Sequence, residues 1–314
     1  MSIAGPLEWI VFSIAVAVVL AVDLIVAGRG GRATVLSAAL WSGAWIGLGL
    51  AFGGWVAARF GGHVGLVYLT AYTLEKSLSV DNLFVFALIF SQTGIPTTLQ
   101  HRALFWGIAG ALVMRAIMIG LGLYLLASFH WVVYPFAALL AFAAVRLLWG
   151  EEAERKLTDA TCNLCTSWVA RFVPISPVPH GRRFLVRMDG RLMATPLLVA
   201  LVAIEAADLV FAVDSIPAVL AITRDPFLVY TSNVFALFGL RSLYFLLAGA
   251  MQRLRFLRTG LAIILLFAAA KMLLSEAIEI PSAASLTVIV CIFLGSVAAS
   301  RFIGPRETSA QKRQ

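Results

Sequence analysis

The most informative residues of this chain are five acids in the middle of two long apolar segments, residues 69–90 and 196–222. These acids are Glu75, Asp81, Glu205, Asp208 and Asp214. A carboxylate near the centre of a bilayer costs roughly 2.5–3.5 kcal/mol on insertion scales, so such residues usually face the interior of a helix bundle and mark an ion or proton path. Two clusters of this kind predict that the chain moves a cation.

Short polar side chains accompany these acids on the same helix faces. At about 100° per residue, Asn82 falls within about 20° of Glu75, and Ser215 falls within about 20° of Asp208. The four histidines lie in expected loops or at span ends, and no cysteine is near the acids. Carboxylate, amide and hydroxyl oxygens suit Mg²⁺, Ca²⁺ or Mn²⁺ better than Zn²⁺ or Cu⁺.

We therefore expect three aspartates to coordinate a divalent cation: Asp81, Asp208 and Asp214. The close neighbours or additional ligands are expected to be Glu75, Glu205, Asn82 and Ser215. Metal binding at such a site should release protons, with an affinity that weakens as the pH falls.

Asp214 lies about 120° from Asp208 around a straight helix, so such a helix cannot aim both carboxylates at one ion. Pro217 leaves the carbonyl of Val213 without its usual donor. We expect a local break at 213–217 that turns Asp214 inward.

The alternative role for these acids is to neutralise buried bases. Lys76, Arg115, Arg241 and Lys271 lie within the same apolar spans. A pairing of Glu75 with Arg115 or Lys271 is the simplest case, and this interpretation carries more weight for Glu75 and Glu205 than for the three aspartates together. Arg146 is expected to reach the cytoplasmic end of its helix.

The elements that must position these residues are membrane helices. The 314 residues are 61% hydrophobic and 13% charged, whereas soluble domains average about 25% charged residues. A span needs about 20 residues, and the apolar stretches of that length are 7–28, 33–57, 64–92, 103–127, 131–150, 193–222, 227–250, 259–279 and 283–302. The sequence predicts an all-α membrane protein with nine transmembrane helices, and residues 1–314 form a single polytopic domain.

The basic residues are divided unequally between the two sides of the predicted membrane domain. They gather after the first, third, fifth, seventh and ninth spans, whereas the opposite side carries Arg59 and Arg224. The positive-inside rule then places the N-terminus outside and the C-terminus in the cytoplasm of a bacterial inner membrane. This distribution accounts for the net charge of +8 without a nucleic-acid partner. Residues 151–192 become a basic cytoplasmic loop.

That loop contains the motif CNLC, formed by Cys162 and Cys165 with two residues between them. The spacing is used by zinc and redox sites. Because no second CxxC is present, a plain pair of reduced thiols is the favoured interpretation.

Residues 64–150 and 193–279 resemble each other along their lengths. EKSLSVDN, which begins at Glu75, matches DLVFAVDS, which begins at Asp208, and Arg115 matches Arg241. Each unit contains three predicted helices, so the second unit enters the membrane from the opposite side. The prediction is two inverted repeats, helices 3–5 and 6–8, with helices 1, 2 and 9 at the periphery; transporters of this plan bind substrate at the repeat interface.

The segments EKSLSVDNLFVFALIF and 184–245, which includes AIEAADLVFAVDSIPAVLAI, resemble the TerC/Alx family of integral membrane proteins. The resemblance implies an inner-membrane protein of metal-ion homeostasis, with manganese export as the best-supported activity of Alx-type members. It also implies that the metal site uses the five intramembrane acids. Other members carry a tellurite-resistance label, and plant relatives are tied to thylakoid protein insertion. CNLC is not part of the family pattern.

The expected function is export of a divalent cation by a secondary transporter, with Mn²⁺ first and Ca²⁺ or Mg²⁺ as alternatives. No nucleotide-binding motif is present, so protons are the candidate coupling ion. The expected partners are the cation, protons and the lipid bilayer, and no resident cofactor is expected. The alternatives are a membrane protein-insertion partner and a tellurite-resistance factor. Neither HExxH nor a serine elbow is present, so we expect no enzymatic activity.

Overall fold

The computed structural model describes residues 2–28, 35–149, 151–176, 180–188, 190–247, 256–274 and 280–302. Its helices in chain order are α1 (Pro6–Gly28), α2 (Val35–Phe60), α3 (Gly62–Gln92), α4 (Thr97–Ser128), the short 3₁₀ turn η1 (His130–Val132), α5 (Val133–Leu148), α6 (Glu151–Phe172), α7 (Pro196–Leu220), α8 (Pro226–Leu237), α9 (Leu240–Leu247), α10 (Leu257–Leu274) and α11 (Ser282–Phe302). A two-stranded antiparallel hairpin, β1 (Leu185–Met188) and β2 (Arg191–Ala194), separates α6 from α7. The predicted all-α class is confirmed.

Five of the described helices are long and apolar enough to cross a membrane: α2, α4, α7, α10 and α11. Two shorter apolar stretches, Pro6–Val22 and Val133–Leu148, belong to α1 and α5. Helix α3 has 31 residues but carries the charged side chains of Glu75, Lys76 and Asp81. These lengths and compositions are those of a helical membrane protein.

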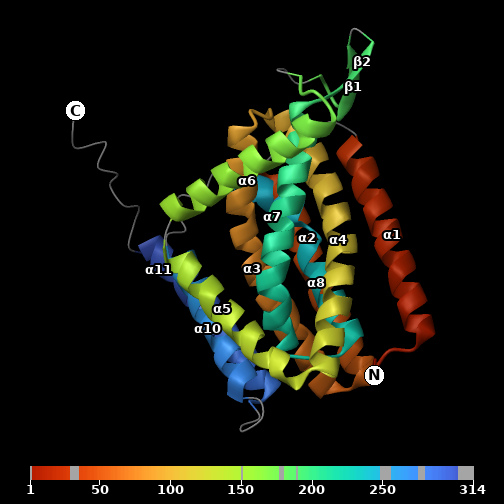
Figure 1. Cartoon of the computed structure of the whole chain (residues 1–314). Coiled ribbons are helices and arrows are strands. Elements are labelled where there is room, and N and C mark those ends of the chain that lie inside the picture. Colours follow the sequence, from red (N-terminus) through yellow and green to blue (C-terminus); the bar gives the residue numbers. More distant parts are fainter. Residues whose placement is uncertain are drawn as a thin grey trace.

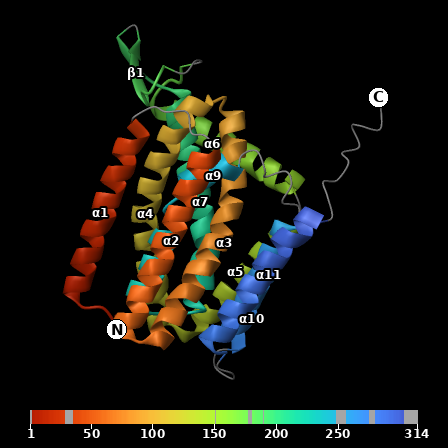
Figure 2. The same cartoon turned by 180° about the vertical axis from the view of Figure 1, so that it is seen from behind.

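Helices α3, α4, α7 and α8 form the centre of the bundle, with α3 packed against α7 and α8, and α4 packed against α7. Helices α5 and α10 pack closely on each other and lie tilted against one side of this centre, with α11 behind them (Figures 1 and 2). Helix α2 packs on α3. The acid-bearing helices α3 and α7 are therefore surrounded by protein on most sides.

Small residues let the central helices approach each other closely. A Cβ atom on Gly107 of α4 would lie 2.8 Å from Cγ2 of Ile204 in α7, and one on Gly49 of α2 would lie 2.7 Å from the ring of Tyr72 in α3. Close backbone approach at glycine is a general feature of helix packing in membranes. Substitution of either glycine would push the acid-bearing helices away from their neighbours.

The predicted single helix 227–250 is wrong, because the structure breaks it into α8 and α9. Gly239 lies at the break with φ +80°, in the left-handed region that glycine adopts without strain. A Cβ atom there would also lie 2.7 Å from Cβ of Trp45. An apolar stretch gives no sign of this break, because Gly239 is also compatible with a membrane helix.

Lys76 of α3 stabilises the broken end of α8. Its ammonium group donates hydrogen bonds to the carbonyls of Ala236 and Phe238, both at 3.0 Å. The last carbonyls of a helix lack intrahelical partners, and a cation is favourable there. Lys76 is thus committed to the backbone of the neighbouring helix.

Residues 151–192 contain regular structure that we did not predict. Helix α6 packs against α7 and α3, and the β1–β2 hairpin pairs Leu185 with Ala194 and Met188 with Arg191. The side-chain amide of Gln92, the last residue of α3, donates a hydrogen bond to Asp159 of α6. This segment therefore folds against the end of the bundle at which α3 ends and α7 begins (Figure 1).

Candidate functional site

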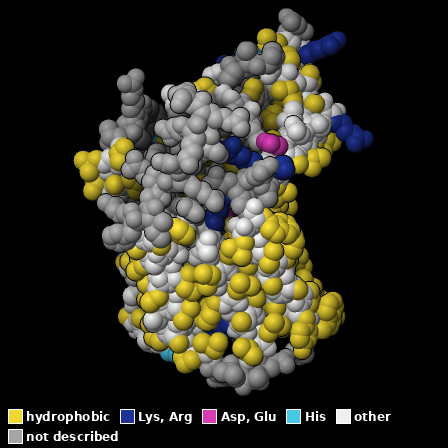
Figure 3. Space-filling model, turned by 90° about the vertical axis from the view of Figure 1, so that its left-hand side faces the viewer, with side chains coloured by type: hydrophobic (Ala, Val, Ile, Leu, Met, Phe, Trp, Pro, Cys, Tyr) yellow, Lys and Arg dark blue, Asp and Glu magenta, His cyan; other side chains and the backbone are white. Residues whose placement is uncertain are grey.

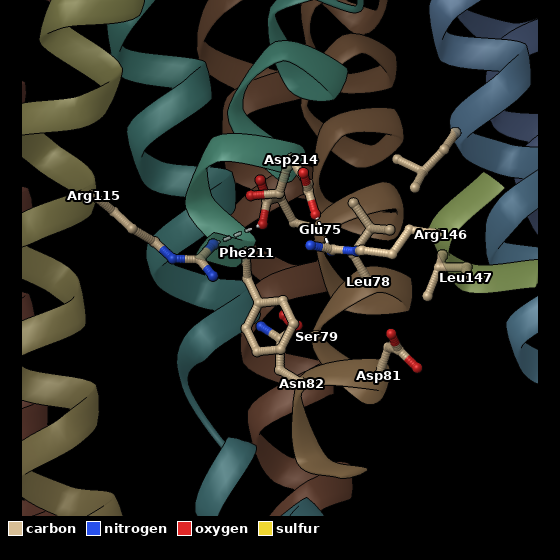
Figure 4. A pocket seen from close by; sticks show the side chains of 12 residues that line it. Glu75, Leu78, Ser79, Asp81, Asn82, Arg115, Arg146, Leu147, Phe211 and Asp214 are labelled. Atoms are coloured by element: carbon tan, nitrogen blue, oxygen red, sulfur yellow. Dashed lines mark hydrogen bonds and ion pairs between the residues drawn. The ribbon is translucent and has the colours of Figure 1, made fainter. Parts of the chain in front are cut away.

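The acids of α3 and α7 meet where these two helices pack in the centre of the bundle (Figure 4). Glu75, Asp81 and Asp208 are buried, and Asp214 is half-buried. Each is placed by a helix rather than a loop, so the geometry of the site depends on the packing of α3 against α7.

Arg115 of α4 pairs with one acid from each of these two helices. Its Nη1 atom lies 3.0 Å from Oε2 of Glu75, and its Nη2 atom lies 3.0 Å from Oδ1 of Asp208. Its Nε atom donates to Oδ2 of Asp208 at 3.2 Å, and Nη1 also approaches Oδ1 of Asn233 in α8 at 3.3 Å. With Arg115 only 1% exposed, this is a fully buried, bidentate ion-pair network.

A second set of ion pairs lies closer to α5 and α10. Arg146 of α5 forms an ion pair with Asp214, and Arg258 of α10 lies 3.9 Å, Nε to Oδ1, from Asp81. Figure 4 shows Arg115 and Arg146 reaching toward the acids from opposite sides. The acids of α3 and α7 are thus divided between two flanks of the site. Arg115 of α4 holds Glu75 and Asp208 on one flank, and the arginines of α5 and α10 hold Asp214 and Asp81 on the other.

Between the two flanks lies a cavity of about 30 Å³. Three acids line it, Glu75, Asp81 and Asp214, together with two bases, Arg115 and Arg146. Its neutral polar lining is Ser79, Asn82 and Ser215. Phe211 and Leu265 are among its apolar walls. Such a volume holds one particle of about the size of a water molecule, so it has room for a metal ion only without its hydration shell.

Four oxygen atoms of this lining are buried without a hydrogen bond: Oε1 of Glu75, Oγ of Ser79, Oδ1 of Asp81 and Oγ of Ser215. Leaving a buried polar group unpaired costs about 1–3 kcal/mol, and more for a charged group. Oxygens without a hydrogen-bond donor are potential ligands of a cation, in a lining that sets three acids against two arginines. The oxygen-only donor set also has the composition that the sequence analysis expected for a hard divalent ion.

The structure brings together only part of the predicted ligand set. Glu75, Asp81, Asp214, Asn82 and Ser215 line the cavity, whereas Asp208 is turned toward Arg115 and does not. Within the described ranges, no three His, Cys, Asp or Glu side chains are grouped to hold a metal ion. Coordination by three aspartates stays a prediction.

Glu205 stands apart from the cavity, against α4. Its carboxylate lies so close to Gly110 that a Cβ atom at that position would overlap it. The glycine therefore provides the space for Glu205, which is half-buried beside the central bundle.

The expected break of α7 at 213–217 is wrong. The helix is continuous from Pro196 to Leu220 with Pro217 inside it. Pro217 lies in the last turns, where one missing hydrogen bond costs less than in the middle of a helix. The continuous helix instead sends Asp208 toward α4 and Asp214 toward α5, the divergence that the helical angle requires.

Arg146 and Arg258 are the site residues that the sequence analysis missed. The sequence predicts Arg146 at the cytoplasmic end of its helix, and Arg258 is one of the bases that follow the seventh predicted span. A usable signal is that LLAFAAVRLLWGEE, with Arg146, resembles ILLFAAAKMLLSEA, with Lys271, so that both units carry a base late in their third helix. Lys271 itself donates to Oγ of Ser285 at 2.8 Å.

Comparison with known proteins identifies the family of this chain. Residues 60–308 match the integral membrane protein TerC family. The chain belongs to the TerC family. The match begins at the end of α2 and extends past α11, so both acid-bearing helices lie within it. The expected family resemblance is confirmed, and the chain is an integral multi-pass membrane protein.

Relatives within the TerC family cover nearly the whole chain. "Uncharacterized membrane protein STKORF319" of Myxococcus xanthus is 43% identical over 300 residues, with 95% of this chain and 93% of the relative covered. "Putative membrane-bound redox modulator Alx" of Escherichia coli strain K12 is 41% identical over 303 residues, with 93% and 94% covered. "Uncharacterized membrane protein RC1219" of Rickettsia conorii is 36% identical over 297 residues, with 94% and 97% covered. No solved structure matches the chain.

Proposed function

We propose that this TerC family protein is a secondary transporter, not an enzyme, that exports a divalent cation, with Mn²⁺ first, from the bacterial cytoplasm. The observation that carries the proposal is the cavity between α3 and α7, with three acids in its lining and with buried oxygens that lack a hydrogen bond on Glu75, Ser79, Asp81 and Ser215. Intramembrane acids that face a bundle interior mark substrate and ion pathways. Oxygen donors without imidazole or thiolate favour Mn²⁺, Mg²⁺ or Ca²⁺.

Charge balance suggests how the cation would enter. The acids of the two flanks are paired with three guanidinium groups, those of Arg115, Arg146 and Arg258. A divalent cation in the cavity therefore needs at least one base to move away. Arg146 is the best candidate, because its side chain is 23% exposed whereas that of Arg115 is 1% exposed. In the proposed cycle Arg146 holds Asp214 in the empty state and yields it to the cation.

The packing pattern supports the inverted-repeat plan for this cycle. If α3, α4 and α5 correspond to α7, α8–α9 and α10, then α4 packing on α7 corresponds to α8 packing on α3. Helices α5 and α10 are themselves a corresponding pair, so a two-fold axis between the units maps their contact onto itself. Each of these helices also gives one arginine to the opposite acid-bearing helix, Arg146 near the end of α5 to Asp214 and Arg258 at the start of α10 to Asp81, although the two arginines are not equivalent positions of the repeat. A two-fold relation of this kind is the plan of many secondary transporters.

The proposed membrane arrangement has nine spans, with α8 and α9 counted as one broken span and α6 outside the count. Figure 3 shows hydrophobic side chains over the lower part of one face and basic side chains at the end that carries the hairpin. Arg182, Arg183, Arg187 and Arg191 are exposed there. By the positive-inside rule this end faces the cytoplasm and the N-terminus lies outside.

The name of the Alx relatives raises redox modulation as a competing function. In this chain Cys162 and Cys165 are free thiols buried beneath α6. Burial, with smaller contributions from the nearby Cys165 and Asp159, raises the pKa of the Cys162 thiol to about 11. The thiolate is the reactive form, so this pair is poorly suited to redox chemistry near neutral pH.

Neither of the other two alternatives, a membrane protein-insertion partner or a tellurite-resistance factor, needs the buried acid cavity.

The deciding experiment is Mn²⁺ uptake into proteoliposomes, with Ca²⁺, Mg²⁺ and Zn²⁺ as competitors. Asp81→Asn, Asp208→Asn and Asp214→Asn should each reduce uptake, and Mn²⁺ affinity should fall most for the cavity-lining pair. Asp159→Asn on the exposed side of α6 is the matched control and should transport normally. If all three site variants keep wild-type uptake and affinity, the acids are structural counter-charges and the transporter proposal fails.

A further inference from the structure

Helix α6 has three distinct faces, although it was expected to be part of a polar loop. Its first face is a narrow buried stripe of Thr158, Cys162, Cys165 and Val169, which falls within about 60° of arc on the helix. Helix α6 packs against α7 and α3. This contact fixes the rotation of the helix about its own axis, and so fixes the direction in which the other two faces point.

The second face is apolar and exposed. It consists of Leu157, Leu164, Trp168 and Phe172, which are 50%, 71%, 59% and 68% exposed. These four fall within about 80° of arc, centred about 95° from the buried stripe. A contiguous row of large apolar side chains on the surface marks a site of interaction with a protein or a membrane.

The third face is polar. Lys156, Asp159, Asn163, Thr166 and Ser167 are exposed on the side of the helix that neither apolar face uses. An apolar stripe beside a polar face is the pattern of a helix that lies in the plane of a membrane interface. The polar side then contacts water, the apolar side contacts acyl chains, and the buried stripe contacts the bundle.

The position and charge of α6 agree with this arrangement. Gln92 at the end of α3 bonds to Asp159, so α6 lies at the end of the bundle at which a spanning helix leaves the membrane. The exposed bases Arg155, Lys156 and Arg171 lie on α6 itself, and the arginine-rich β1–β2 hairpin follows it. Juxtamembrane bases of this kind are attracted to anionic lipid headgroups.

We propose that α6 is an interfacial helix whose Leu157–Leu164–Trp168–Phe172 stripe inserts among the acyl chains of an anionic leaflet, while Arg155, Lys156 and Arg171 contact the lipid phosphates. The occupant of the exposed stripe is thus phospholipid with an anionic headgroup, and not a second protein. This inference does not rest on the proposed transport activity, because no residue of the stripe lines the acid cavity.

The first test uses spin labels on the full chain, with its three cysteines replaced, in nanodiscs of phosphatidylcholine and phosphatidylglycerol. Leu164→Cys carries the label on the apolar stripe, and Ser167→Cys is the matched control on the polar face. We expect the ratio of O₂ to nickel-chelate accessibility to be several-fold higher at 164 than at 167. Equal ratios at the two positions would overturn the proposal, and so would a label at 164 that neither reagent reaches, since that marks a protein contact.

The second test leaves the cysteines in place. Brominated phosphatidylglycerol should quench the emission of Trp168, isolated as the difference between the wild-type protein and Trp168→Phe, more strongly than brominated phosphatidylcholine does. Joint replacement of Arg155, Lys156 and Arg171 by Gln should remove the preference for the anionic lipid. Emission of Trp168 that responds to aqueous acrylamide and not to either lipid would refute the insertion of α6.

Discussion

Arg115 holds Asp208 through two parallel hydrogen bonds, from Nη2 to Oδ1 at 3.0 Å and from Nε to Oδ2 at 3.2 Å. This fork joins α4 to α7 inside the bundle, and a third bond from the same guanidinium joins α4 to α3. The acid cluster therefore links three helices and is also a charged site. Mutations can distinguish its contribution to stability from its contribution to ion binding.

Arg115→Gln should destabilise the protein strongly. The change leaves Glu75 and Asp208 buried without a counter-charge, and breaking a buried pair by removing one partner costs about 3–5 kcal/mol. Thermal unfolding in detergent, followed by loss of the monodisperse chromatographic peak, measures the effect. Arg59→Gln, at a 61% exposed side chain, is the matched control. Adding Asp208→Asn to Arg115→Gln should restore part of the lost stability; no restoration would contradict the ion-pair account.

Arg146→Gln should bind Mn²⁺ more tightly than wild type and transport it more slowly. Removing the guanidinium frees Asp214 for the cation, but it also removes the group that reclaims Asp214 when the ion leaves. Equilibrium Mn²⁺ binding and proteoliposome flux measure the two effects separately, with Arg146→Lys as the charge-conserving control. Unchanged affinity in Arg146→Gln, alongside loss of affinity in Asp214→Asn, would reject the counter-ion role while leaving the transport site intact.

Mn²⁺ affinity should fall as the pH falls. Carboxylate ligands must be deprotonated to bind a metal, so protons compete with the cation and binding releases them. Calorimetric titration of Mn²⁺ in buffers of different ionisation enthalpy counts the protons released. Affinity that does not vary with pH in the wild type would show that the ion does not displace protons from the acids.

Alkylation of Cys162 should be slow at neutral pH and should accelerate as the pH rises. Burial raises the pKa of this thiol to about 11, and the thiolate is the nucleophile. The rate should therefore increase about tenfold for each pH unit up to the pKa. Peptide mass spectrometry after iodoacetamide treatment of inverted vesicles gives the rate. Rapid modification at neutral pH would indicate that α6 opens away from the bundle.

Gly239→Ala should destabilise the α8–α9 junction. Its φ of +80° is unfavourable for alanine, and the new methyl group would meet Trp45 at 2.7 Å. Backbone strain of this kind costs on the order of 1–3 kcal/mol. A melting comparison with Gly120→Ala, where a Cβ atom meets nothing within 4 Å, isolates the effect. Equal melting temperatures for the two variants would disprove it.

The placement of the acids was predictable because it depends on helix geometry alone. Glu75 and Asp81 on one helix, and Asp208 and Asp214 on another, are polar positions in apolar spans, and such positions face the bundle interior. The divergence of Asp208 and Asp214 also follows from the helical angle. The family could be identified from the same segments, because its motifs contain these acids.

The partners of the acids were less predictable, because spacing along one helix does not say which neighbour it faces. Arg146 and Arg258 reach the site only because α5 and α10 pack beside α7 and α3. Helix α6 was missed for a different reason. Its apolar residues are separated by polar ones, so its average hydropathy is that of a loop although its periodicity is that of a helix.

The pairing of α5 with α10 has a mechanical consequence. The two helices form a pair that lies against the central bundle. Each carries one arginine that forms an ion pair with the bundle, Arg146 with Asp214 and Arg258 with Asp81. Both carboxylates line the same cavity. A cation that binds both carboxylates competes with both arginines at once. Under the proposed function, binding of the cation and release of the α5–α10 pair from the central bundle would therefore be coupled.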